Sequence, residues 1–156
     1  MPLSEKIQRK VMILDGVFDP WERQKDYQQE SLRDHANFGA TASFIGTMRD
    51  FNEGDDVSSM VLEHYPEMTT KQLNRIIDIA ENKWPLLNTL IIHRVGHILP
   101  SEPIMLVAVW SKHRAAAFDA CRYLMEELKH NAPFWKKEEL SAGGSRWVEK
   151  NTDGYE

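Results

Sequence analysis

Basic residues gather in one stretch of an otherwise acidic chain. The 156 residues carry a formal net charge of −5, yet residues 111–138 hold 6 Lys and Arg against 4 Asp and Glu, together with two of the six histidines. Such a cluster is typical of a cationic pocket for a small anionic ligand, and equally of a solvated helix face. The charge pattern leaves both interpretations open.

One predicted helix carries basic residues at both of its ends. Ser111-Lys112-His113-Arg114 lies where an apolar run gives way to this helix, and the free N–H groups of a helix N-terminus favour an anion. Lys129 lies near the other end, so a site that uses both ends must wrap around the helix. In the alternative, Lys129 only interacts with the last carbonyl groups of its own helix.

A strand is predicted directly after Pro133, and it brings opposite charges together. Extended backbone places Lys136 and Glu138 on one face and Lys137 on the other. Lys136 and Glu138 are then either a cation with its proton partner or an ordinary surface ion pair. Arg49 ends another predicted strand. Its guanidinium suits bidentate binding of phosphate or carboxylate, although a single Arg is more often a surface residue.

Metal and thiol chemistry find no support in the sequence. The single cysteine, Cys121, lies on the apolar stripe of the predicted helix, where an inert buried thiol is expected. His93 and His97 are four residues apart, but Gly96 and a strand-like pattern keep them off a common helix face. We therefore expect neither a metal nor another cofactor. An enzyme with this sequence must work with Lys, Arg, His and carboxylates.

Three helices are predicted from apolar spacing and capping residues. The first begins at Pro20 and is capped by Asp19. The second begins at a capping box formed by Thr69 and Gln72 and ends before the next proline. The third extends over about 112–130. Its inward face is predicted to consist of Phe118, Cys121, Met125 and Leu128.

Seven strands are predicted from short apolar or alternating runs, over residues 11–17, 39–49, 57–65, 89–95, 103–110, 134–140 and 145–149. The run 103–110 is apolar throughout, which is typical of a central strand. Together the elements predict an α+β fold in a single domain of residues 1–156, with helices packed on a mainly antiparallel sheet.

Neither a membrane nor a nucleic acid is an expected partner. The longest apolar run, 104–110, is far too short to span a bilayer. A chain that is acidic overall gives no sign of the basic face that binds a nucleic acid duplex. We therefore expect a soluble cytoplasmic protein.

Five sequence motifs occur in order between about residue 38 and residue 149. They are Phe44-Ile45-Gly46-Thr47-Met48-Arg49, Leu62-Glu63-His64-Tyr65-Pro66, His93-Arg94-Val95-Gly96, Ser111-Lys112-His113-Arg114, and Ala132-Pro133-Phe134-Trp135-Lys136-Lys137-Glu138 through Arg146-Trp147-Val148-Glu149. In this combination the chain resembles the family of large, catalytic subunits of molybdopterin synthase.

The resemblance implies a sulfurtransferase of molybdenum cofactor biosynthesis. Members of the family convert cyclic pyranopterin monophosphate to molybdopterin by inserting two sulfurs, which form the dithiolene. The sulfur arrives as a thiocarboxylate on the C-terminal glycine of a small ubiquitin-like subunit. The family fold is an α/β hammerhead with additional C-terminal strands. Two large subunits form a central homodimer, and a small subunit at each end completes a heterotetramer.

The resemblance also assigns roles to individual residues. Lys129 matches a lysine that handles the thiocarboxylate or forms a transient covalent adduct, and Lys136 matches one that stabilises the substrate and an oxyanion, although these roles can be exchanged. His113 is the expected proton shuttle, because its ordinary pKa lies near neutrality. Glu138 would orient Lys136 or carry a proton. The positions that match substrate or anion contacts are Thr47, Met48, Arg49, His113, Arg114, Lys129, Lys136, Lys137 and Glu138.

Two positions depart from the family pattern. Thr47 stands where a basic residue is common, which removes one phosphate contact. Lys137 stands where Arg is common, so a bidentate contact becomes a point charge. In the family the site draws on both large subunits, so the resemblance also allows His113 and Arg114 to serve the pocket of the neighbouring protomer.

Rival functions make different predictions for the same residues. In a non-catalytic module that binds a nucleotide-like anion, neutralising Lys129 would weaken binding without abolishing a reaction. An acyl transferase would use Lys129 or His113 on a thioester, and would not consume a protein thiocarboxylate. A purely structural role would leave the basic stretch at 111–138 without a purpose.

Overall fold

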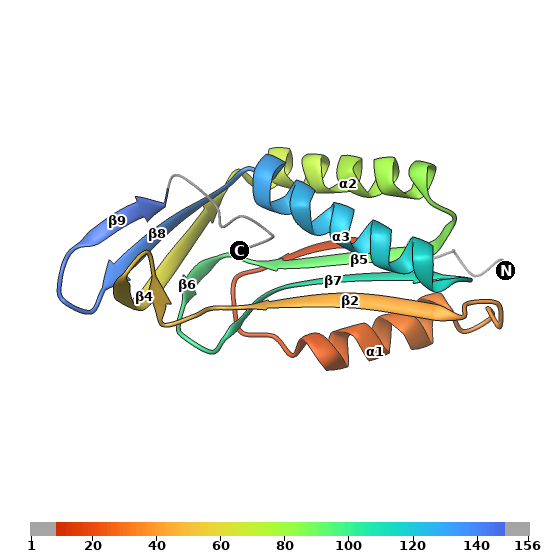
Figure 1. Ribbon diagram of the computed structural model, residues 1–156, viewed down its shortest axis with the longest axis horizontal. Coiled ribbons are helices and arrows are strands. Elements are labelled where there is room, and N and C mark those ends of the chain that lie inside the picture. The colour runs from red at the N-terminus through yellow and green to blue at the C-terminus, as the bar shows by residue number, and fades with distance from the viewer. Residues whose placement is uncertain (1–8, 149–156) are drawn as a thin grey trace, which may run out of the picture.

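The structure, a computed structural model, describes residues 9–148, which form nine strands and three helices (Figure 1). In chain order the elements are β1 (Val11–Leu14), α1 (Pro20–Ser31), β2 (Ala40–Thr47), β3 (Phe51–Asn52), β4 (Asp55–His64), α2 (Pro66–Lys83), β5 (Leu86–Arg94), β6 (Gly96–Ile98), β7 (Pro103–Ser111), α3 (Arg114–Asn131), β8 (Phe134–Leu140) and β9 (Ser145–Val148). Antiparallel pairing dominates and β1 pairs in parallel with β5, so the predicted α+β class is confirmed. None of the described helices is long and apolar enough to cross a membrane.

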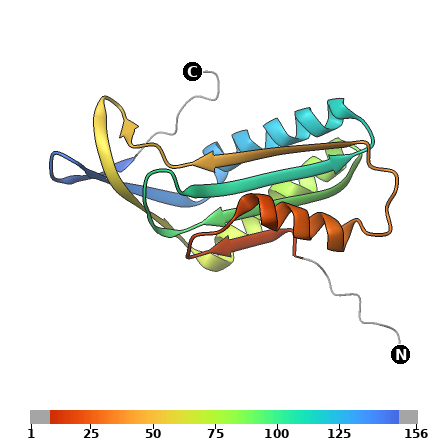
Figure 2. The same ribbon diagram turned by 90° about the horizontal axis from the view of Figure 1, so that it is seen from below.

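The four-stranded sheet lies between two layers of helices. Its strand order is β1-β5-β7-β2, so β7 is an interior strand, as predicted. Helices α2 and α3 cover one face and α1 covers the other (Figures 1 and 2). Ile91 and Val107 pack toward α2 and α3, whereas their neighbours Leu90 and Leu106 pack toward α1. Burial on both faces explains why β7 is apolar at successive positions.

A second sheet projects from one end of the first (Figure 1). Its strand order is β3-β4-β8-β9, and β6 also pairs with β4. Strand β8 is antiparallel to β4 and places Lys136 opposite Leu62. Because only Ala132 and Pro133 separate α3 from β8, the last turn of the helix and the first half of this strand meet where the two sheets join.

The helix starts follow the prediction for α1 but not for α2. Asp19 caps α1 as predicted, since its side chain accepts hydrogen bonds from two backbone N–H groups of the first turn. The predicted capping box at Thr69 is wrong, because α2 begins one turn earlier, at Pro66, after Tyr65. Proline suits a first helical position because its φ is already helical and it has no N–H to satisfy. The Thr69 side chain is buried, and its hydroxyl donates to the carbonyl of Pro133 at 3.4 Å.

The buried face of α3 differs from the prediction at one position. Cys121, Met125 and Leu128 are buried as predicted, but Phe118 is 68% exposed. The smaller Ala117 occupies the core at this end of the helix. Position 118 therefore lies beside the buried stripe and faces the open edge of the sheet at β2.

Several strand ends differ from the predicted boundaries, and β3 and β6 were not predicted. Strand β2 ends at Thr47 rather than at residue 49, and β5 begins at Leu86 rather than at residue 89. Strand β1 ends at Leu14, before the exposed Val17. Strand β9 is described as far as Val148. Glu149, which the sequence also assigned to this strand, lies outside the described residues.

Candidate active site

A small pocket lies at the junction of the two sheets, below the last turn of α3. It has a volume of about 70 Å³, which is enough for ordered water but not for a pterin. Most of the residues that line it are apolar. The ionisable side chains that line it are Lys129 from α3, Lys136 from β8 and His93 from β5.

Both lysines of this pocket have lowered pKa values. Burial is the largest cause for Lys129, and the positive charges of Lys136 and Arg49 lower its pKa further. Burial also lowers the pKa of Lys136, although the negative charge of Glu138 opposes this effect. Two partly dehydrated cations near each other favour an anionic ligand, and a lowered pKa makes a larger fraction of lysine available as a nucleophile.

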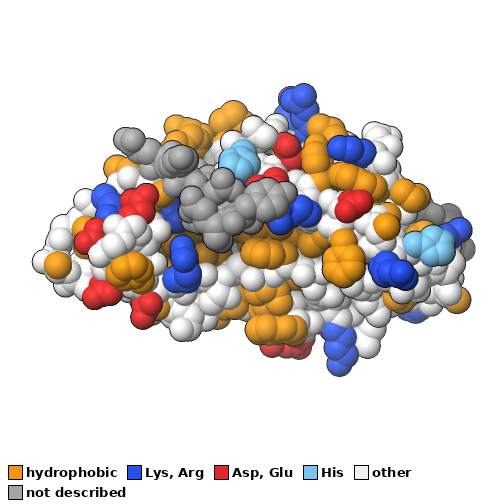
Figure 3. All heavy atoms as spheres, in the orientation of Figure 1, with side chains coloured by type: hydrophobic (Ala, Val, Ile, Leu, Met, Phe, Trp, Pro, Cys, Tyr) orange, Lys and Arg blue, Asp and Glu red, His pale blue; other side chains and the backbone are white. Residues whose placement is uncertain are grey.

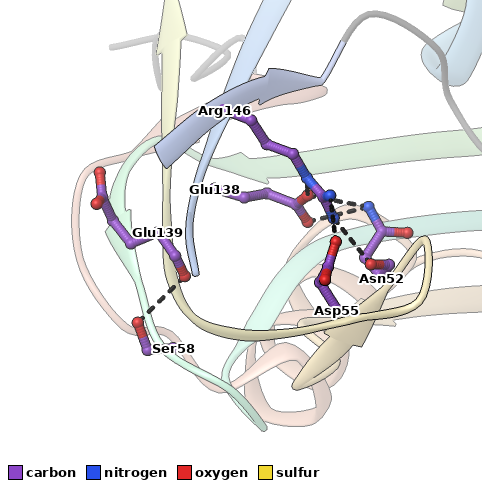
Figure 4. A network of polar contacts seen from close by, with 6 residues as sticks. All are labelled: Asn52, Asp55, Ser58, Glu138, Glu139 and Arg146. Carbon is purple, nitrogen blue, oxygen red and sulfur yellow. Dashed lines mark hydrogen bonds and ion pairs between the residues drawn. The ribbon is translucent and has the colours of Figure 1, made fainter. Parts of the chain in front are cut away.

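Glu138 is held by a polar network of side chains from neighbouring strands (Figure 4). Its side chain is 4% exposed and accepts hydrogen bonds from Asn52 Nδ2 at 3.1 and 3.0 Å and from Arg146 Nε at 3.1 Å. Arg146 also donates to Asp55 at 2.8 Å and to the carbonyl of Asn52 at 2.8 Å. Lys136 lies on the same face of β8 as Glu138, whose negative charge affects its pKa. The closest partners of the Glu138 carboxylate, however, come from β3 and β9.

The end of β2 contributes residues with different surroundings. Arg49 lies close enough for its charge to lower the pKa of both pocket lysines. Thr47 is exposed, whereas Met48 is 4% exposed and packs with Val57 and Met60 in the core of the five-stranded sheet. Met48 therefore supports the wall of the site from within the core.

Three other predicted site residues lie away from the pocket of the same chain. His113 and Arg114 are at the start of α3, and the rise of the helix puts Arg114 about 22 Å from Lys129. Lys137 points to the opposite face of β8, where its Nζ lies 5.9 Å from the ring centroid of Trp147. Within one chain, the structure thus brings together Lys129, Lys136 and Arg49 but not these three residues.

Sequence reasoning missed His93, Asn52 and Arg146. His93 reads as a core residue of an apolar strand, and only the proximity of β5 to the end of α3 reveals its place in the pocket. Arg146 lies directly across from Glu138 in the β8–β9 pair. Pairing the predicted strands 134–140 and 145–149 with each other would have placed Arg146 beside Glu138.

The remaining candidate nucleophile, Cys121, lies about two turns before Lys129 on α3 and lines the groove between β2 and α3. Cys121 is buried on α3, and burial raises the pKa of its thiol to about 11, as expected of an inert thiol. Among residues 9–148, no three His, Cys, Asp or Glu side chains are grouped so that they could hold a metal ion.

A larger open groove connects the surface to Lys129. It has a volume of about 890 Å³ and lies between β2 and α3, with Phe44, Phe118 and Met125 in its wall. Lys129 lines both this groove and the small pocket. Figure 3 shows hydrophobic side chains among Lys and Arg side chains on this face of the molecule.

The chain is similar to known proteins in both sequence and fold. The protein-family model described as MoaE protein matches residues 19–131. The molybdopterin synthase catalytic subunit of Ralstonia nicotianae is 57% identical over 111 residues, which cover 71% of this chain and 62% of that relative. The catalytic subunit of Pseudomonas aeruginosa is 45% identical over 139 residues, which cover 89% of each chain. The crystal structure of molybdopterin synthase from Staphylococcus aureus is 30% identical, covers 90% of this chain and 98% of that one, and has a TM-score of 0.78.

The extent of these matches identifies the family. The chain spans less than two thirds of the Ralstonia relative but most of the Pseudomonas relative and of the Staphylococcus structure. The family model includes Arg49, His113 and Lys129, and the match to the Pseudomonas relative extends over most of the chain. The chain therefore belongs to the MoaE protein family, and the curated relatives that establish this are molybdopterin synthase catalytic subunits.

Proposed function

We propose that this chain converts cyclic pyranopterin monophosphate to molybdopterin, with sulfur from the C-terminal thiocarboxylate of a small ubiquitin-like subunit. The observation that carries the proposal is the pair of lysines, Lys129 and Lys136, which reach one pocket from two elements and have pKa values lowered by burial. The substrate carries a phosphate and the donor a thiocarboxylate, so the reaction needs a site that holds two anions.

The position of each side chain in or near the pocket indicates its role in the reaction. Lys129 lines both the groove and the pocket, so it receives the donor thiocarboxylate. Lys136 and Arg49 stabilise the substrate phosphate and the negative charge that develops on oxygen during transfer. In each transfer the donor sulfur forms a C–S bond to the substrate, and water then cleaves the C–S bond to the donor's carbonyl carbon, so the donor leaves as a carboxylate and two donors are used for one dithiolene. Glu138 lies on the same face of β8 as Lys136, and its negative charge keeps the Lys136 ammonium group oriented.

The sulfur must come from a partner. Cys121 is buried and the pKa of its thiol is raised to about 11, so it is a poor sulfur donor. The groove between β2 and α3 is open, partly apolar and leads to Lys129, which suits an extended C-terminal tail. We take this groove as the entry of the small subunit's tail.

We also propose that the working assembly is a dimer of this chain with one small subunit at each end. His113 and Arg114 lie about 22 Å from Lys129 along α3, too far to act in the pocket of their own chain. In the dimer they would complete the neighbouring protomer's site, where His113 transfers protons and Arg114 binds an anion. We further propose that residues 1–156 act as a single domain and that the protein works in the cytoplasm.

A reconstituted reaction tests the function. The purified chain is mixed with a thiocarboxylated small subunit and cyclic pyranopterin monophosphate, and molybdopterin is measured as its fluorescent oxidised derivative. We expect turnover that falls by about 10²-fold or more in Lys129→Ala. Lys71→Ala is the matched control, since Lys71 is exposed on α2, and it should react normally.

Other outcomes separate the rival functions. A folded chain that binds the small subunit but gives no product would be a binding module. Consumption of a thioester, without use of the thiocarboxylate, would instead indicate an acyl transferase.

A further inference from the structure

His93 is a buried ionisable group in the lysine pocket, and none of the roles above uses it. It lies near the end of β5, is 4% exposed and lines the pocket together with Lys129 and Lys136. The positive charge of Lys129 also acts on its imidazole. The two side chains are therefore close neighbours across the pocket.

One hydrogen bond determines which ring nitrogen of His93 carries the proton. Nδ1 lies 2.8 Å from the carbonyl oxygen of Arg94. A carbonyl only accepts, so Nδ1 is the donor and the neutral ring keeps its lone pair on Nε2. Burial, aided by the charges of Lys129 and His64, lowers the pKa of His93 to about 4 against the opposing effect of the Arg94 carbonyl. The ring is therefore neutral near pH 7.

Aromatic stacking fixes the orientation of the imidazole. Its centroid lies 3.9 Å from that of Phe134, with 14° between the ring planes. His64 stacks near the same phenyl ring, with 6.3 Å between centroids. Phe134 is two residues before Lys136 on β8, so it shares that face of the strand. The stack thus connects the imidazole to the strand that carries the second pocket lysine.

The composition of the pocket wall shows what the imidazole can supply. Among the described side chains that line this pocket, the two lysines are hydrogen-bond donors and the others, apart from His93, are apolar. Nε2 of His93 is therefore the one nitrogen acceptor in the wall. An ammonium group that donates one of its three hydrogens to this acceptor has its other hydrogens directed into the pocket.

We propose that His93 is a positioning residue of the lysine pocket, whose Nε2 accepts a hydrogen bond from the Lys129 ammonium and directs this group toward its anionic partner. The anionic partner rests on the proposed function, but the contact between His93 and Lys129 belongs to the folded chain alone. Within residues 9–148, Lys136 and Arg49 are charged groups that act on Lys129, and Lys129 and His64 are titratable groups that act on His93.

Two variants separate the acceptor from the shape of the ring. His93→Phe keeps an aromatic ring for the stack on Phe134 and removes the acceptor. His93→Gln supplies an amide oxygen near the position of Nε2. If His93→Phe does not fold, His93→Asn takes its place, because it keeps a donor near the Arg94 carbonyl but is too short to reach Lys129.

The first measurement needs no substrate. The chain is acetylated with limiting acetic anhydride over a range of pH, and the labelling of Lys129 is followed by mass spectrometry, with Lys71 as the internal control. An acceptor stabilises the charged amine, so its loss in His93→Phe should move the labelling midpoint of Lys129 to lower pH. His93→Gln should restore the midpoint, and that of Lys71 should not move.

The second measurement is turnover in the reconstituted reaction. We expect His93→Phe to lower kcat roughly ten- to a hundredfold with little change in KM, and His93→Gln to recover most of this loss. An unchanged midpoint and kcat in the folded variant lacking the acceptor would overturn the proposal, as would a His93→Gln variant no better than His93→Phe. If the wild-type chain gives no product while the Lys129 midpoint still responds to His93, the proposed function fails and the contact stands.

Discussion

Asn52 supplies two of the hydrogen bonds that hold the buried carboxylate of Glu138. Its Nδ2 lies 3.1 and 3.0 Å from the two carboxylate oxygens. A hydrogen bond to a charged group contributes about 1.5–3 kcal/mol, and here one amide makes both contacts. We therefore expect Asn52→Ala to lower the free energy of unfolding by about 2 kcal/mol.

Thermal unfolding followed by circular dichroism at pH 7 measures this loss. For a chain of this length, each kcal/mol corresponds to about 2–4 °C in Tm, so Asn52→Ala should unfold about 4–8 °C below the wild type. Asn74→Ala is the matched control. Asn74 also donates from Nδ2, to the carbonyl of Thr70 at 3.0 Å, but on the exposed side of α2, so its loss should be much smaller.

Equal melting temperatures for Asn52→Ala and Asn74→Ala would refute this reasoning, since the Glu138 network would then contribute no more than a surface contact. Asn52→Asp adds a second test. It places a carboxylate against that of Glu138, and like charges raise the pKa of carboxylates. This variant should be less stable than the wild type at pH 7 and recover part of the loss as the pH falls, because a protonated carboxyl group can donate.

Three further predictions follow from the surroundings of single residues. Lys136→Ala should lower turnover by about 10²-fold, while Lys137→Ala, on the other face of β8, should retain most of it; steady-state kinetics that rank them in reverse would contradict the site. Cys121→Ser should keep its turnover and melt at a lower temperature, and a folded but inactive variant would mean that the thiol takes part. Burial lowers the pKa of His93 from 6.5 to about 4, so the unfolded chain binds the extra proton first as the pH falls through this range. The wild type should therefore lose about 2 kcal/mol between pH 7 and pH 5, measured by urea unfolding, and His93→Gln should lose less; parallel pH profiles would argue against a buried neutral imidazole.

Local sequence determined the parts of this protein that depend on neighbouring residues. Asp19 before Pro20 predicts the start of α1, because a capping side chain needs only the next turn of backbone. The apolar run of β7 predicts an interior strand, because helices cover both faces of the sheet. Alternation after Pro133 likewise puts Lys136 and Glu138 on one face. The motifs around these residues were enough to predict the family.

Tertiary structure decided which of these groups meet. The distance between His113 and Lys129 follows from the length of α3. The sequence alone could not show whether the rest of the chain forms one site that includes both ends of this helix. The exposure of Phe118 depends on the open edge of β2 beside it. The place of His93 beside Lys129 depends on the end of β5 lying near the last turn of α3, although the two elements are far apart in sequence. Periodicity specifies which face of an element a residue occupies, but long-range packing alone specifies what that face contacts, and the chemistry of the pocket depends on those contacts.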